Sequence, residues 1–153
     1  MMTDQTNGFD PLRLDCQLCF PLYVCAKEIV RKYKPHLDGI DLTYTQYLAM
    51  MVLWERRTVN VRDLGRILTL DSGTLTPLLK KLEQKGYLVR ARDKQDERCL
   101  DVSLTEKGEK LKDRAACIPG KVAPCLGLSP EEAKTLHSLL HRILAHLPET
   151  EEG

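Results

Sequence analysis

The 153-residue sequence predicts a mostly α-helical fold with one small β-hairpin wing. Apolar residues recur at helical spacing near both ends of the chain and through its middle. Segments 87–92 and 98–104 instead alternate apolar and polar residues on either side of a polar turn, which is typical of a hairpin. A hydrophobic content of 42% is enough to build a core, and 29% charged residues is typical of a globular domain.

The first predicted helix covers residues 11–36, with Leu14, Leu18 and Leu22 on one face. Pro21 lies within this segment. Since an interior proline removes one backbone hydrogen bond, we expect it to free the carbonyl of Gln17 and to bend the helix.

Three helices are expected in the middle of the chain. Thr43 and Gln46 match a capping box that opens a helix ending near residue 56. Asn60 begins a short helix over 61–68, and a turn over 69–71 leads to another helix over 72–85, with Asp71 or Ser72 as its cap.

After the hairpin, Thr105 is expected to cap a charged helix that ends near Cys117, where Pro119 and Gly120 break it. Ser129, with a proline and an acidic residue just after it, opens the last helix. Its apolar side carries Leu136, Leu140, Ile143, Leu144 and Leu147.

A short helix, a tight turn, a second helix and a basic hairpin follow one another over residues 43–104. This order predicts a winged helix-turn-helix, a DNA-binding arrangement. The helices over 11–36 and 105–147 have no place in so small a unit, so we expect a helical dimerisation region there. A two-fold homodimer suits a palindromic double-stranded DNA operator. Residues 1–10 and 148–153 are expected to be flexible ends.

The net charge of +1 excludes a polycation, so DNA binding requires a local patch. Residues 80–98 hold seven basic residues against four acidic ones. The second helix of the pair would read the major groove, and the hairpin tip would enter the minor groove. The residues expected to bind DNA are Asp71, Ser72, Gly73, Thr74, Thr76, Lys80, Lys81, Arg92, Lys94, Gln95 and Arg98.

The longest apolar run has about eight residues, whereas a membrane span needs roughly 20. The first ten residues lack the features of a secretory signal, so we expect a cytoplasmic protein. Neither Cys16-x-x-Cys19 nor the His137–His141 pair has further ligands, and we expect no metal and no cofactor.

Four segments carry a resemblance to the MarR family and, within it, to the organic-hydroperoxide-sensing OhrR branch. They are QLCFPLY at 17–23, LTYTQY at 42–47, LDSGTLTPLLK at 70–80, and DER with SLT at 96–98 and 103–105. The similarity covers about residues 11–147. It implies a winged dimer joined through its first and last helices, which represses peroxidase genes and releases DNA when a thiol is oxidised.

The resemblance implies that Cys19 is the redox-sensing thiol. Tyr23 shares its helix face, but Tyr33 follows 14 residues later, about 21 Å along the axis and out of reach within one subunit. The resemblance therefore implies that Tyr33 and Tyr44 of the other subunit donate hydrogen bonds to the thiolate.

Similarity to two-cysteine members points to Cys125 as the resolving thiol, with Cys117 as second choice. Cys16, Cys25 and Cys99 are expected to be small buried apolar residues. Two other functions stay open: a MarR-type repressor released by a small apolar or phenolic ligand, and a thiol peroxidase. Since a peroxidase has no use for a winged segment, we expect a protein that is not an enzyme.

Overall fold

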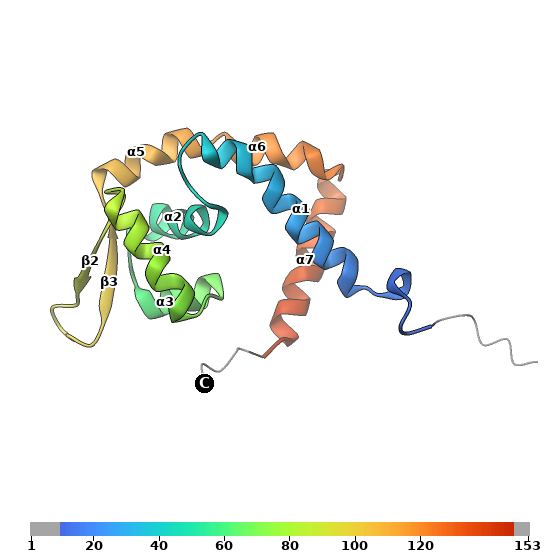
Figure 1. The fold of residues 1–153 in the computed structure, drawn as a ribbon, viewed down its shortest axis with the longest axis horizontal. Coiled ribbons are helices and arrows are strands. Elements are labelled where there is room, and N and C mark those ends of the chain that lie inside the picture. The colour runs from blue at the N-terminus through green and yellow to red at the C-terminus, as the bar shows by residue number, and fades with distance from the viewer. Residues whose placement is uncertain (1–9, 149–153) are drawn as a thin grey trace, which may run out of the picture.

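The computed structural model describes residues 10–148 (Figure 1). The predicted flexible ends, 1–10 and 148–153, lie outside the described residues except for Asp10 and Pro148. In chain order the elements are the 3₁₀ turn η1 (Leu14–Cys16), α1 (Cys19–Asp38), α2 (Tyr44–Arg56), β1 (Thr58–Asn60), α3 (Val61–Leu68), α4 (Ser72–Gln84), β2 (Leu88–Arg92), β3 (Leu100–Leu104), α5 (Glu106–Ala115), α6 (Ile118–Val122), the 3₁₀ turn η2 (Ala123–Leu126) and α7 (Pro130–His146).

The predicted fold class, a mostly helical winged helix-turn-helix, is confirmed. Helices α3 and α4 are joined by a short turn, and the β2–β3 hairpin follows (Figure 1). The sheet has a third strand that was not predicted: β1 pairs with β3, so that the antiparallel order is β1-β3-β2. Val102 of β3 lies between Val59 of β1 and Arg90 of β2.

Side-chain caps fix where the helices start. The capping boxes of α2, between Thr43 and Gln46, and of α7, between Ser129 and Glu132, are both complete. Asn60 accepts a hydrogen bond from the backbone of Arg62 at 2.9 Å and thereby caps α3. Each cap satisfies a backbone N–H group that the first turn of a helix leaves without a partner.

The core lies where α2 crosses α4 and the sheet. Its largest fully buried side chains are Leu37, Met50, Leu53, Leu64, Leu75, Leu79, Leu82, Leu88, Val102, Ile118 and Val122. Helices α5 and α6 run along one side of this winged unit, and α1 slopes away from it (Figure 1). The indole N–H of Trp54 in α2 donates to the carbonyl of Gly108 in α5 at 2.9 Å, which ties these two helices together.

The first helix begins later than predicted. Residues 14–16 form the separate turn η1, and α1 starts at Cys19. Pro21 therefore stands in the first turn, where its missing N–H has no partner within the helix to lose. The predicted loss of a hydrogen bond at the carbonyl of Gln17 is thus wrong, and the interior proline of α1 is Pro35.

Helix α5 ends at Ala115, close to the predicted end near Cys117, but Pro119 and Gly120 do not themselves form the break. A proline at a first helical position is pre-set for helix, and both residues lie inside the short helix α6. Helix α7 turns away on the side remote from the hairpin (Figure 1). It has no buried residue, and Leu136, Leu140, Ile143, Leu144 and Leu147 remain exposed.

Between residues 10 and 148, no helix has both the length and the apolar character needed to cross a bilayer.

Candidate DNA-reading surface and thiol site

Helix α4 separates a buried apolar face from an exposed polar one. Leu75, Leu78, Leu79 and Leu82 face the core. The residues predicted to contact DNA on this helix are all exposed: Ser72, Gly73, Thr74, Thr76, Lys80 and Lys81. The core thus positions α4 with a row of hydroxyl and ammonium groups turned outward.

Asp71 has a structural task that the DNA-binding prediction did not include. Its carboxylate accepts the backbone N–H of Thr74 at 2.7 Å and the Thr74 hydroxyl at 3.3 Å. Asp71 is therefore the N-cap of α4, in place of the alternative Ser72. It also holds the Thr74 side chain at the start of the helix.

The hairpin tip is ordered by its own side chains. The guanidinium of Arg92 donates to the carbonyl of Glu97 at 2.7 Å, and Asp96 accepts the backbone N–H of Arg98 at 3.1 Å. Lys94 and Gln95 are exposed between them, as is the side chain of Arg98. All four predicted wing residues are therefore exposed at the hairpin tip, with Arg92 at the end of β2 and the other three in the loop that follows.

Two basic residues of the stretch 80–98, Arg90 and Lys85, form contacts within the protein instead of facing outward. Arg90 donates to Glu83 of α4 through its guanidinium at 3.1 Å and through its backbone N–H at 2.9 Å. These hydrogen bonds lower the pKa of Glu83. Lys85 contacts the turn before α2. The patch that faces outward is accordingly smaller than the sequence count suggested.

Cys19 is the first residue of α1, and its side chain is exposed. The first turn of α1 carries no acidic residue, and Leu18 before it offers no side-chain cap. The N–H groups of a first turn give this end of a helix a partial positive charge. The sequence prediction had placed Cys19 several residues inside the helix, where this effect is weak.

The tyrosines occupy two separate places. Tyr23 is exposed one turn after Cys19, with the Lys27 ammonium 5.3 Å from its ring centre. Tyr33 of α1 and Tyr44 of α2 pack together with ring centres 5.1 Å apart. Tyr47, which the sequence analysis missed, completes this cluster at 5.9 Å from Tyr33 and 6.3 Å from Tyr44. Its position one turn after Tyr44 was the available signal.

Burial raises the pKa of Tyr44, and the neighbouring Tyr33 raises it further. Burial likewise raises the pKa of Tyr47. Both phenols therefore keep their protons at neutral pH and can serve as hydrogen-bond donors. The structure brings Tyr33 and Tyr44 together, whereas Cys19 of the same chain stands at the opposite end of α1.

The other cysteines differ in exposure. Cys117 and Cys125 are both exposed, and Cys16 and Cys99 are half-buried instead of buried as predicted. Burial and the carboxylate of Asp96, which accepts the Cys99 thiol at 3.6 Å, raise the pKa of Cys99. Cys25 was expected to be buried but is exposed, because it lies on a part of α1 that this chain does not cover.

Among the residues that the structure describes, no three histidine, cysteine or acidic side chains gather as metal ligands. His137 and His141 are exposed on α7 with ring centres 4.1 Å apart.

Comparisons with known proteins agree with this architecture. A family model described as transcriptional regulator SarA/Rot matches residues 31–115. The organic hydroperoxide resistance transcriptional regulator of Bacillus subtilis is 47% identical over 141 residues, which are 92% of this chain and 96% of the relative.

Solved structures give the same result. Over-oxidised AbfR of Staphylococcus epidermidis bound to DNA has a TM-score of 0.73 and 35% identity, covering 90% of this chain and 97% of that one. AbfR with a disulfide formed has a TM-score of 0.62 and 33% identity, covering 88% and 94%. A mutant MarR of E. coli in complex with operator DNA shares the fold with a TM-score of 0.77 at 24% identity, covering 83% and 93%.

Near-complete coverage of the B. subtilis relative, together with the winged unit and the thiol at the start of α1, assigns the chain to the organic-hydroperoxide (OhrR) branch of the MarR family of transcriptional regulators.

Proposed function

We propose that the protein is a cytoplasmic homodimeric repressor that releases a palindromic operator when an organic hydroperoxide oxidises Cys19. The observation that carries this proposal is the separation of two half-sites on one chain. An exposed thiol begins α1, and the packed phenol rings of Tyr33 and Tyr44 lie near the other end of that helix. Since α1 is continuous, a second chain has to bring the two halves together. The protein is a regulator and not an enzyme.

The uncovered apolar residues support the dimer. Leu12, Leu14 and Leu18 are exposed before α1, and the leucines of α7 are exposed along one face. Exposed apolar side chains gathered on these segments indicate an interface. We assign 11–36 and 105–147 to the dimerisation region and 43–104 to the DNA-binding region. In a two-fold dimer, the start of one α1 then meets the tyrosine pair of the other.

DNA binding follows from the exposed face of α4 and from the wing. The start of α4 enters the major groove, where Ser72, Thr74 and Thr76 meet base edges and phosphates. Lys80 and Lys81 contact phosphate further along the helix. The wing places Arg92 and Arg98 at the minor groove.

The oxidation step requires only the thiol and the peroxide. The Cys19 thiolate attacks one peroxide oxygen, the O–O bond breaks, and the leaving alkoxide takes a proton to become an alcohol. Sulfur has then lost two electrons and is a sulfenic acid. The thiol of Cys125 condenses with it, an S–S bond forms, and water leaves. Tyr33 and Tyr44 of the partner donate hydrogen bonds that favour the thiolate.

The packing supports Cys125 over Cys117 as the resolving thiol. Cys117 stands between Ala115 and Ile118, and both of these are buried in the core. Cys125 lies in η2, which has no buried residue. A disulfide requires Cα atoms within about 7 Å of each other, so one segment has to move. Moving η2 exposes less apolar surface than moving the segment around Cys117.

The comparisons are consistent with such a movement. AbfR with its disulfide formed resembles this chain less closely than DNA-bound AbfR does. Disulfide formation would shift α4 and the wing away from this arrangement.

The test is an operator-binding assay, with a duplex first selected from random sequences by the reduced protein. Cumene hydroperoxide should release the wild-type protein, and Cys19→Ser should stay bound. Tyr44→Phe should bind equally well when reduced but oxidise more slowly. Cys125→Ser should prevent the interchain disulfide seen by non-reducing mass spectrometry. Release of Cys19→Ser by the peroxide would refute the proposal.

The alternative of release by a small ligand has weaker support. A shallow hollow lined by Met51, Trp54, Glu55 and Lys112 is mostly apolar and wide open to solvent. Small-molecule sites usually enclose most of the surface of their ligand. Release by an apolar or phenolic acid under reducing conditions would favour this second function.

A further inference from the structure

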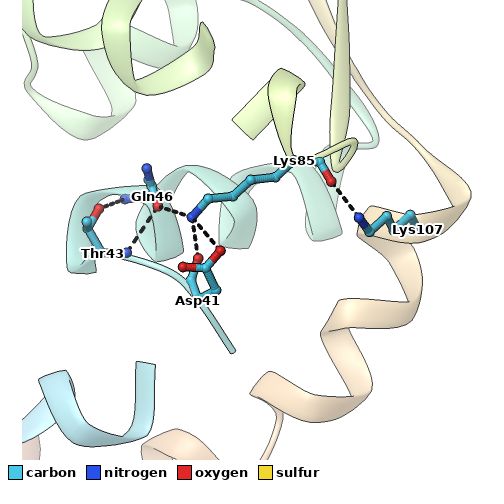
Figure 2. A network of polar contacts seen from close by, with 5 residues as sticks. All are labelled: Asp41, Thr43, Gln46, Lys85 and Lys107. Atoms are coloured by element: carbon cyan, nitrogen blue, oxygen red, sulfur yellow. Dashed lines mark hydrogen bonds and ion pairs between the residues drawn. The ribbon is translucent and has the colours of Figure 1, made fainter. Parts of the chain in front are cut away.

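Lys85 directly follows the DNA-reading helix α4, yet its side chain points toward a distant turn. Its ammonium contacts the backbone carbonyl of Asp41, the Asp41 carboxylate at 3.2 Å and Oε1 of Gln46 at 3.4 Å (Figure 2). The Lys85 side chain is 26% exposed and the Asp41 side chain 82%, so solvent screens the ion pair to the carboxylate more than it screens the contact to the buried Gln46. Through these three oxygens, the Lys85 ammonium connects the end of α4 to the turn before α2.

The same junction sets the position of Tyr44. Oε1 of Gln46 also accepts the backbone N–H of Thr43 at 3.1 Å, while the Thr43 hydroxyl accepts the backbone N–H of Gln46 at 3.2 Å (Figure 2). Tyr44 is the first helical residue between these two capping groups. Oε1 of Gln46 therefore accepts hydrogen bonds both from the cap that positions Tyr44 and from Lys85 at the end of α4. Gln46 is 3% exposed, so a broken bond here is not readily replaced by water.

The backbone around Lys85 leaves little freedom to absorb a displacement. The Lys85 N–H donates to the carbonyl of Lys81 at 3.0 Å, within the last turn of α4. Its own carbonyl accepts the ammonium of Lys107 of α5 at 2.7 Å (Figure 2). On the other side, Asp41 has a φ of 54°, in the left-handed region, which aspartate and asparagine adopt more readily than most residues other than glycine.

We infer that Lys85 is the positioning residue that couples the tyrosine pair to the DNA-reading helix. This inference rests on the proposed function. A displacement of Tyr44, caused by oxidation of the partner's Cys19, disturbs the cap at Thr43 and Gln46. The lysine then carries the displacement to the end of α4, and the helix leaves its DNA-binding position.

The experiment measures operator affinity before and after cumene hydroperoxide for wild type, Lys85→Met, Asp41→Asn and Lys110→Met. Lys110→Met is the matched control, because it removes one lysine ion pair, to Glu106 at 3.0 Å, outside this network. Asp41→Asn keeps the backbone carbonyl contact and the left-handed turn, which asparagine tolerates. Melting temperature and the rate of Cys19 oxidation are measured for each protein.

Lys85→Met should keep its reduced affinity within about threefold of wild type, while the ratio of oxidised to reduced Kd falls about tenfold. Asp41→Asn should give an intermediate ratio, Lys110→Met should respond as wild type, and Cys19 should oxidise at the same rate in all four. If wild type releases DNA and both Lys85→Met and Asp41→Asn release it equally, the coupling role is refuted. The coupling role is also refuted if the ratio of oxidised to reduced Kd falls only because reduced Lys85→Met binds the operator poorly. If wild type itself does not respond to the peroxide, the proposed function fails first.

Discussion

Gly108 in α5 packs tightly against the backbone of Tyr87, just before β2, and replacing it with alanine should destabilise the protein strongly. A Cβ there would lie 2.2 Å from the carbonyl oxygen of Tyr87 and 2.8 Å from Cδ1 of Leu104. The first of these is a backbone atom, so α5 as a whole has to shift. That shift also stretches the bond that the indole of Trp54 donates to Gly108.

The expected change in the free energy of unfolding combines one stabilising effect with two destabilising ones. Alanine is favoured over glycine inside a helix by about 1 kcal/mol. Overpacking against a fixed backbone costs about 1–3 kcal/mol, and stretching the partly buried hydrogen bond of Trp54 costs about 1 kcal/mol more. A Cβ 2.2 Å from a backbone oxygen places the overpacking cost at the upper end of that range. We therefore expect a net loss of about 2–3 kcal/mol in the free energy of unfolding.

The assay is urea unfolding at one fixed protein concentration, because dimer stability depends on concentration. Trp54 is the single tryptophan of the chain and reports directly on the contact. Gly120→Ala is the matched control, since a Cβ there meets nothing within 4 Å on a helical segment, and it should be neutral or slightly stabilising. If Gly108→Ala unfolds at the same urea concentration as wild type, the close packing of α5 on Tyr87 is refuted.

Two further outcomes are expected. Arg90 holds the pKa of Glu83 below its usual value of 4.5, so the pair stabilises the fold above pH 4.5. This stabilisation is lost as the pH falls through the lowered pKa of Glu83. The melting temperature of Glu83→Gln should therefore fall less than that of wild type between about pH 7 and about pH 3. Ile143→Lys places a charge on the exposed apolar face of α7 and should dissociate the dimer in analytical ultracentrifugation, whereas Ser138→Lys, on the opposite side of that helix, should not.

Features set by local chemistry were predictable from the sequence. The caps at Thr43, Asn60 and Ser129 each depend on a partner two or three residues away, and each was predicted and found. The spacing on one helix also showed that Tyr33 cannot reach Cys19 of its own chain. Such signals need only a few neighbouring residues and the geometry of a helix.

Features set by distant partners were not predictable. Strand β1 has three residues with one buried side chain, and only its pairing with β3 makes it a strand. Lys85 was counted only as one charge of the basic stretch 80–98, because a sequence shows its charge but not its contact with Asp41, 44 residues earlier. The start of α1 at Cys19 was missed because apolar spacing is the same through η1 and the helix.

Because α1 separates the thiol from the tyrosine pair, two variants that each lack one of these groups should complement each other in a mixed dimer. If each pocket takes its thiol from one chain and its phenols from the other, a Cys19→Ser chain and a Tyr33→Phe, Tyr44→Phe chain complement each other. Their mixed dimer holds one intact pocket and one that lacks both contributions. Two preparations that each fail to respond to peroxide would, once subunits exchange, recover part of the response.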